Sequence, residues 1–302
     1  MVNMTSLLEM QGQFFLLVLL GMFFRRKVVS AQFQRELSQV IVDLLLPCNI
    51  LISFQVTLNS EMVSRAVSVF LISLAGQLVS LALAKFAFNR VAPDRRSVMQ
   101  STSICSNAGF LGMPVAEGIW SGEGVFFASI FLLPVRFFMW TVGVTFFCKE
   151  KGRALMKKLL TNPCIIATLL GLVLLLTQWR LPAVLYSTLS SLSRCVTGMS
   201  MFMIGMTVAH LHWRDFLDKQ VLLVSALRLI GQPAIIWLGC RLLGAEPLAT
   251  SVSVILMAMP AGATVALMAA RYNCAEEFAA DVVTVSTILS LFTIPLWAIL
   301  LT

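Results

Sequence analysis

Charged residues are scarce in this chain. Asp, Glu, Lys and Arg make up 12% of its 302 residues, whereas hydrophobic residues make up 59%. The mean hydropathy is +0.91, well beyond the balance that is typical of a soluble domain. This scarcity excludes an ordinary soluble fold and predicts an all-α membrane protein that crosses the bilayer many times.

Several sequence motifs of enzymes are also missing. The chain contains no GxxxxGK[ST] sequence, which excludes a P-loop for ATP, and no GxSxG nucleophile elbow. Its two histidines, His210 and His212, flank a predicted cytoplasmic loop, and its seven cysteines show no CxxC or metal-type spacing. We therefore expect no enzyme activity, no cofactor and no metal centre, and we interpret the cysteines as small apolar fillers.

Long apolar runs supply the membrane-spanning segments. A helix needs roughly 20 apolar residues to cross a hydrocarbon core of about 30 Å, and these runs are too long and too continuous for barrel strands. The sequence predicts ten spans, at 5–24, 37–57, 64–88, 98–119, 124–147, 160–178, 183–208, 220–243, 248–270 and 279–301.

Basic residues are unevenly distributed between the loops. None precedes Arg25, so the first apolar run lacks the charge order of a cleaved signal peptide. With the N-terminus outside, the cytoplasmic loops hold 16 of the 22 Lys and Arg, and the external loops hold only Arg65, Arg180 and Arg241. The positive-inside rule then predicts a plasma (inner) membrane protein with both termini outside the cytoplasm. Contact with anionic membrane lipids accounts for the net charge of +8, so we expect no nucleic-acid partner.

Weak internal matches divide the chain into two halves. Three pairs of short segments match in the same order: LVLLGMFF at 17–24 with ATLLGLVL at 167–174, LAGQLV at 74–79 with LIGQPA at 229–234, and GMP at 112–114 with AMP at 258–260. We expect a first repeat at 1–147, a short basic cytoplasmic linker at 148–161 and a second repeat at 162–302. Five spans per repeat is an odd number, so the second repeat should enter the bilayer inverted, as in many secondary transporters.

The stretch SNAGFLGMPVAEG at 106–118 places helix-breaking residues inside a predicted span. Gly112 and Pro114 allow the backbone to leave helical geometry, and Pro260 and Gly262 repeat this device in span nine. A broken helix is tolerated in a membrane only where its freed backbone groups face protein or water. We expect spans four and nine to be broken and to cross near the membrane midplane. The alternative is that the two prolines merely kink their helices.

Polar side chains near these breaks are candidates for contact with a ligand. The Asn107 amide can both accept and donate hydrogen bonds to a small polar molecule. Gln77 and Gln232 occupy matching positions in the two repeats. They either line the same cavity or bond across helices.

Arg136, Arg194 and Arg228 lie away from the ends of their predicted spans, and Asp43 is the acidic residue that clearly opposes them. An unpaired guanidinium is costly in a low dielectric and does not lose its proton readily, so a compensating anion is expected. Asp43 and Arg194 occupy nearly repeat-related places in spans two and seven, which favours a structural ion pair. Arg228 either snorkels toward the cytoplasm or faces the cavity. Arg136 has the longest way to either surface, so we expect it to contact the substrate or to gate its passage.

The crossover segments resemble those of a known family. NAGFLGMPV at 107–115 is similar to the first crossover of the auxin efflux carrier family, which includes plant PIN-formed auxin exporters and bacterial organic-anion carriers. MPAGATVALMAARY at 259–272 and STILSLFTIPLW at 286–297 look like the family's C-terminal signature. The resemblance implies a scaffold of spans one, two, six and seven, and a transport domain that moves as an elevator. A homodimer through the scaffold is consistent with that arrangement.

One position departs from the family pattern. Plant members place an asparagine beside the second crossover proline, whereas this chain has Ala258, Met259 and Ala261 around that proline, and Thr264 is the candidate replacement. The predicted substrate-binding residues are Asn107, Gly112, Pro114, Pro260, Gly262, Thr264, Arg136, Gln77 and Gln232.

These features favour a secondary transporter. The resemblance implies a mono- or dicarboxylate such as malate or malonate, or an auxin-like acid, carried by alternating access at a midplane site. A sodium-coupled organic-anion symporter of the bile-acid type is the main alternative, although its acidic sodium ligand has no counterpart at 258–270. Proton coupling through Asp43 is also open, as is an anion channel, which would conduct without saturation.

Overall fold

The computed structural model describes residues 4–27, 30–55, 59–147, 161, 163–209 and 218–301. All regular elements in these ranges are helices, as predicted, and their single isolated β-bridge joins Ser106 to Ala261. The predicted linker lies outside the described residues except for Thr161, and so do His210 and His212.

Four described helices are long and apolar enough to cross a membrane, namely Ser60–Phe86, Ala108–Met139, Lys219–Leu242 and Glu276–Leu301. Four shorter apolar helices are Gly12–Arg25, Ile41–Ser53, Pro163–Thr177 and Pro247–Met257. Each overlaps a predicted span, so the chain is an all-helical, multi-pass membrane protein. The count of ten spans and the inverted repeat remain predictions.

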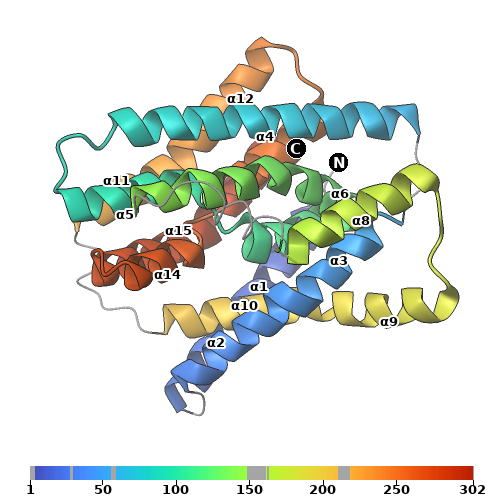
Figure 1. Ribbon diagram of the computed structural model, residues 1–302, viewed down its shortest axis with the longest axis horizontal. Coiled ribbons are helices and arrows are strands. Elements are labelled where there is room, and N and C mark those ends of the chain that lie inside the picture. Colours follow the sequence, from blue (N-terminus) through green and yellow to red (C-terminus); the bar gives the residue numbers. More distant parts are fainter. Residues whose placement is uncertain are drawn as a thin grey trace. The chain divides into compact units, whose positions relative to one another are not determined.

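Two compact units are formed from alternating segments of the chain. Unit 1 comprises 1–67, 109–130 and 160–210. Its helices are α1 (Met4–Lys27), α2 (Ala31–Val40), the π-helix η1 (Ile41–Leu45), α3 (Leu46–Ser53), α8 (Pro163–Thr177), α9 (Ala183–Ser193) and α10 (Cys195–Val208). Within this unit α3 packs against α8 and α9 (Figure 1).

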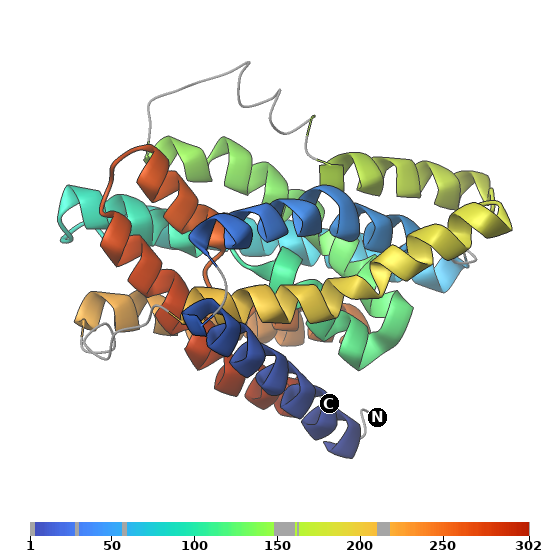
Figure 2. The ribbon, with the colours of Figure 1, turned by 90° about the horizontal axis from the view of Figure 1, so that it is seen from below.

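Helix α1 packs against α10 (Figure 2), and two glycines allow this contact. A Cβ atom on Gly21 would lie 2.0 Å from the carbonyl oxygen of Phe202, and one on Gly205 would lie 2.0 Å from that of Val18. The two backbones therefore touch directly, as small residues allow between membrane helices.

Unit 2 comprises 68–108, 131–159 and 211–302. Its elements are α5 (Pro93–Ile104), the 3-10 helix η3 (Gly143–Phe146), α11 (Lys219–Ala226), the π-helix η5 (Leu227–Gly231), α12 (Gln232–Leu242), α13 (Pro247–Met257), α14 (Ala263–Arg271) and α15 (Glu276–Leu301). The helices α4 (Ser60–Phe86) and α6 (Met113–Thr141), and the π-helix η2 (Ala108–Gly112), contribute residues to both units.

The core of unit 2 gathers apolar residues from α5, α11, α14 and α15. Ile104, Val224, Val265 and Val282 all belong to one buried cluster. Figure 1 shows α14 beside α15, and contacts join both helices to α5. The C-terminal end of α5 and the start of α14 are thus fixed by a shared apolar core.

A kink at Ser121 divides α6 where the sequence predicts the boundary between spans four and five. Ser121 has φ 55° and ψ −143°, which is not helical. A Cβ atom on Gly124 would lie 2.0 Å from the carbonyl oxygen of Ala116. The chain thus turns sharply here, and glycine is needed for the close approach.

Candidate functional site

Two helix interruptions pair with each other inside unit 2, and we call this place the crossing. The first interruption follows α5 at Cys105 to Asn107, and the second follows α13 at Ala258 to Gly262. The backbone N–H of Asn107 donates to the carbonyl of Pro260 at 2.8 Å, and the backbone N–H of Gly262 donates to the carbonyl of Cys105 at 3.0 Å. This short antiparallel pairing satisfies backbone groups that the breaks would otherwise leave without partners. Spans four and nine are thus both interrupted, as predicted, and the alternative of simple kinks is wrong.

The first break is not at the residues that the sequence indicated. Gly112 and Pro114 are both buried, but both lie inside the continuous helical stretch Ala108–Met139, where the π-helix η2 passes directly into α6. The chain instead leaves helical geometry several residues earlier, at Ser106, which pairs with Ala261. Matching GMP to AMP therefore identified similar letters and not equivalent places in the crossing.

Arg228 lies at the centre of this crossing and is only 1% exposed. Its Nε donates to the carbonyl oxygen of Met259 at 3.0 Å, and its Nη1 donates to that of Ser103 at 2.9 Å. Gln232 accepts from the same Nη1 at 2.6 Å and donates its own Nε2 to Ser103 at 3.0 Å. Arg228 therefore does not snorkel, because carbonyls freed at both breaks bind its guanidinium inside the protein.

The charge of Arg228 is offset only in part. The C-terminal end of α5 carries a partial negative charge, which the guanidinium stabilises. Among the described residues no carboxylate forms an ion pair with Arg228, and its Nη2 is buried without a hydrogen-bond partner. A buried cation with one free donor group is suited to bind an anion.

Asn107 and Thr264 lie where the two broken helices resume. Asn107 is 7% exposed and directly precedes η2, while Thr264 is the second residue of α14 and half-buried. The Thr264 hydroxyl contacts the sulfur of Met139 at 3.6 Å. Gly262 is needed beside them, because a Cβ atom there would lie 3.0 Å from the carbonyl oxygen of Ser106. The start of α14 presents unpaired amides and a positive dipole end to this region.

Gln77 and Arg136 are also buried in unit 2, but they take no part in the hydrogen bonds that join Arg228 and Gln232 to the crossing. Gln77 on α4 is 0% exposed, and neither amide atom has a hydrogen-bond partner in the described part of the chain. Arg136 on α6 is 6% exposed and lies one helical turn before Met139. The structure thus brings Gln232 and Arg228 together, whereas among the described residues no hydrogen bond joins Gln77 to them.

The predicted ion pair between spans two and seven is wrong for the described structure. Asp43 and Arg194 are both exposed, and no described ion pair joins them. The helices are joined by a neutral bond, from the Asn49 amide to the Ser193 hydroxyl at 2.9 Å.

Glu117 is a residue that the sequence reasoning missed. It lies inside a predicted span, in the letters AEG that end the stretch at 106–118. Its Oε2 accepts a hydrogen bond from the hydroxyl of Thr197 on α10 at 3.3 Å, within unit 1. A search of that stretch for carboxylates as well as for glycine and proline would have found it.

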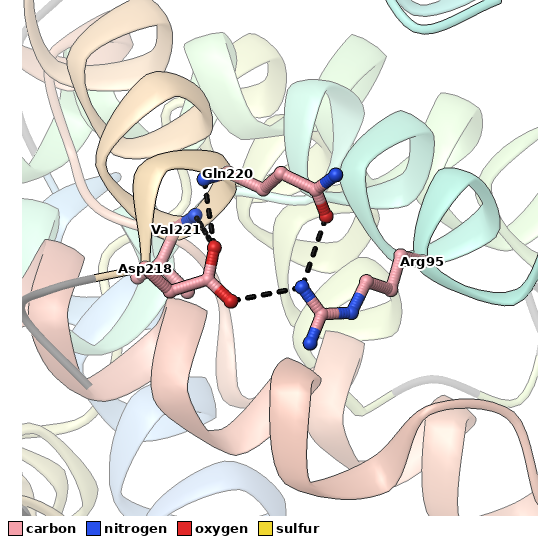
Figure 3. A network of polar contacts seen from close by, with 4 residues as sticks. All are labelled: Arg95, Asp218, Gln220 and Val221. Carbon is pink, nitrogen blue, oxygen red and sulfur yellow. Dashed lines mark hydrogen bonds and ion pairs between the residues drawn. The ribbon is translucent and has the colours of Figure 1, made fainter. Parts of the chain in front are cut away.

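A second polar cluster fixes the start of α11 in unit 2 (Figure 3). Arg95 donates to Asp218 Oδ2 at 2.8 Å and to Gln220 Oε1 at 3.0 Å, and its guanidinium lies 4.6 Å from the ring centre of Phe278. Asp218 also caps α11 by accepting from the backbone amides of Gln220 and Val221. Burial raises the pKa of Asp218, but these hydrogen bonds and the Arg95 charge outweigh it, so the pKa lies below its ordinary value.

No metal-binding group of three His, Cys, Asp or Glu side chains occurs in the ranges that the structure describes. The six cysteines in these ranges are free thiols. Four of them are buried fillers as predicted, whereas Cys195 is exposed and Cys274 is half-buried.

Crossed, interrupted helices with a buried cation between them define a class of protein. Such breaks occur at the binding sites of secondary transporters, where helix ends face a small ligand. The family described as "Membrane transport protein" matches residues 12–298, nearly the whole chain. The chain belongs to this family, which is the auxin efflux carrier family that its crossover segments resemble.

Two archaeal relatives extend this result. An uncharacterized transporter of Methanothermobacter thermautotrophicus is 30% identical over 198 residues, which cover 65% of this chain and 65% of the relative, just under two thirds. An uncharacterized transporter of Methanocaldococcus jannaschii is 23% identical over 295 residues, which cover 93% of this chain and 94% of the relative.

Proposed function

We propose that this protein is a secondary transporter of a small organic anion, a mono- or dicarboxylate or an auxin-like acid. The substrate binds at the crossing of the two broken helices in unit 2, and alternating access carries it across the plasma membrane. The protein performs no chemistry on the substrate.

The observation that carries this proposal is the Arg228 guanidinium. It is 1% exposed, its Nη2 has no partner, and no carboxylate pairs with it among the described residues. Burying an uncompensated cation costs several kcal/mol, and an anionic substrate recovers part of that cost whenever it binds. Asn107 and Thr264 add hydrogen-bonding groups at the starts of the adjoining helices.

The composition of the units supports an elevator mechanism. Unit 1 contains the helices of predicted spans one, two, six and seven, which the family resemblance assigns to a scaffold. Unit 2 contains both breaks, Arg228 and Gln232. Residues 109–130 depart from this division, because they belong to unit 1. We propose that unit 2 carries the substrate, that unit 1 forms a homodimer, and that both chain termini lie outside the cytoplasm.

Counterflow in liposomes tests the proposal. Purified protein is reconstituted, loaded with unlabelled carboxylate and given a panel of labelled mono- and dicarboxylates. We expect saturable counterflow of at least one acid. Arg228→Gln removes a charged hydrogen bond worth about 1.5 to 3 kcal/mol, so the half-saturation concentration should rise roughly 10- to 100-fold. Arg228→Lys keeps the positive charge but loses the planar set of guanidinium donors. Its half-saturation concentration should lie between those of the wild type and Arg228→Gln.

Arg90→Gln is the matched control, because Arg90 is exposed on the turn after α4. Its half-saturation concentration should equal that of the wild type. Thermal unfolding of each variant shows whether it is folded. Folded Arg228→Gln protein with wild-type counterflow would exclude this site, and conductance that does not saturate would identify a channel instead.

A further inference from the structure

The two predicted repeats differ in the side chain available to the C-terminal end of each broken helix. Gln77 and Gln232 are 155 residues apart, and so are Ser106 and Ala261, which pair at the crossing. With this spacing Ser73 on α4 corresponds in the sequence to Arg228 on η5. The Ser73 hydroxyl donates to the carbonyl of Phe131 at 2.7 Å. The second repeat therefore supplies a fixed cation to the end of α5, whereas the first supplies none to the end of α13.

The last turn of α13 has carbonyl groups that its own helix leaves unbonded. The carbonyl of Leu256 would accept from the residue four positions on, but that residue is Pro260, which has no amide hydrogen. The carbonyl of Met257 would accept from Ala261, but the Ala261 amide donates to Ser286 Oγ at 3.2 Å instead. These two oxygens lie at the negative end of the helix dipole.

The buried face of α4 carries polar groups next to a contact with α13. A Cβ atom on Gly76 would lie 3.2 Å from Cε and 3.3 Å from Sδ of Met257, so α4 contacts the side chain of the last residue of α13 here. Gln77 follows directly, and Ser80 is one turn further along. Both are 0% exposed, and neither the Gln77 amide atoms nor Ser80 Oγ has a hydrogen-bond partner in the described ranges. Unsatisfied polar atoms this deeply buried indicate a bound water or ion.

We propose that Gln77 and Ser80, with the free carbonyls at the end of α13, form a binding site for a monovalent cation, Na⁺. The ligands are neutral oxygens, which suit a hard monovalent ion, whereas a divalent ion would require carboxylates. Carbonyls at the C-terminal ends of half-helices coordinate Na⁺ in other broken-helix transporters. The site rests on the proposed function, because the ion would accompany the anion and offset its charge.

Thermal unfolding without any carboxylate tests the site directly. Purified protein is heated in NaCl, KCl or choline chloride at one ionic strength. A ligand that binds only the folded state raises Tm as its concentration increases. We expect Tm to rise with NaCl and not with choline chloride. Gln77→Leu replaces the unsatisfied amide with an apolar group of similar size, so the variant should fold, and its response to Na⁺ should be lost or shifted by about tenfold or more in concentration.

Gln13→Leu is the matched control, because Gln13 is exposed on α1, and it should keep the wild-type response. Arg228→Gln should also keep the Na⁺ response while losing carboxylate counterflow, which separates a failure of this site from a failure of the anion site. Equal Tm increases in all three salts would overturn the proposal. So would an unchanged Na⁺ response in Gln77→Leu.

Discussion

Replacing Gly205 with alanine should weaken the packing of α1 on α10 by a predictable amount. The new Cβ atom would lie 2.0 Å from the carbonyl oxygen of Val18 and 2.9 Å from the Cα atom of Gly21. Real Cβ atoms essentially never approach within 3.0 Å of such atoms, so the two helices must separate locally by about 1 Å. Neither contact is with a flexible side chain that could move aside.

The cost of such overpacking is about 1 to 3 kcal/mol. Alanine recovers up to about 1 kcal/mol of helix propensity, so we expect a net loss of about 1 to 2 kcal/mol and a lower Tm. The double variant Gly21→Ala with Gly205→Ala should lose less than the sum of the two, because one separation accommodates both methyl groups. Unfolding of the purified protein in detergent provides the measurement.

Gly198→Ala is the control on the same helix. A Cβ atom on Gly198 would meet nothing within 4 Å, so this variant should be as stable as the wild type or slightly more stable. If Gly205→Ala and Gly198→Ala unfold at the same temperature, the direct backbone contact between α1 and α10 is refuted.

Three further predictions concern single side chains. Ser286→Ala removes the acceptor of the Ala261 amide and should lower stability by about 1 kcal/mol, measured by thermal unfolding. The pKa of Asp218 is lowered from its ordinary value of 3.8. The ionised Asp218 carboxylate therefore stabilises the folded protein at pH values above 3.8, and this contribution is lost as the pH falls through the lowered pKa. Asp218→Asn should therefore unfold more easily at about pH 6, by less than about 1 kcal/mol, and the difference from wild type should narrow toward about pH 3. Glu117→Gln keeps an acceptor for Thr197 and removes a membrane charge without a described cationic partner, so its Tm should equal or exceed that of the wild type; a clearly lower Tm would show that the charge itself is needed.

The helix breaks were predictable because few residues are compatible with them. Glycine and proline inside an apolar span indicate non-helical backbone, and Pro260 with Gly262 lies at the observed second break. At the first break glycine and proline gave the wrong place, since Gly112 and Pro114 lie inside the helical stretch Ala108–Met139, which begins after the break. Ser106, which does pair across the crossing, has no distinctive conformational preference that a sequence pattern could reveal.

Charged residues show a similar contrast. Asp43 and Arg194 have opposite signs and matching places in the repeats, yet both are exposed, and Asn49 with Ser193 forms the buried link. Their side-chain directions depend on helix rotation, which a repeat offset of uncertain length does not fix. Glu117 was overlooked because attention to glycine and proline took no account of a carboxylate five residues after Gly112.

The sequence by itself determined that this is a multi-pass helical membrane transport protein with two interrupted helices. Those conclusions depend on composition, span length and the conformational limits of glycine and proline, which are local properties of the chain. Only the tertiary structure decided that Arg228 faces inward and bonds to Met259, Ser103 and Gln232. The partners of a buried cation come from segments up to 125 residues away in sequence. Which carbonyls a guanidinium reaches is therefore fixed by how the helices pack.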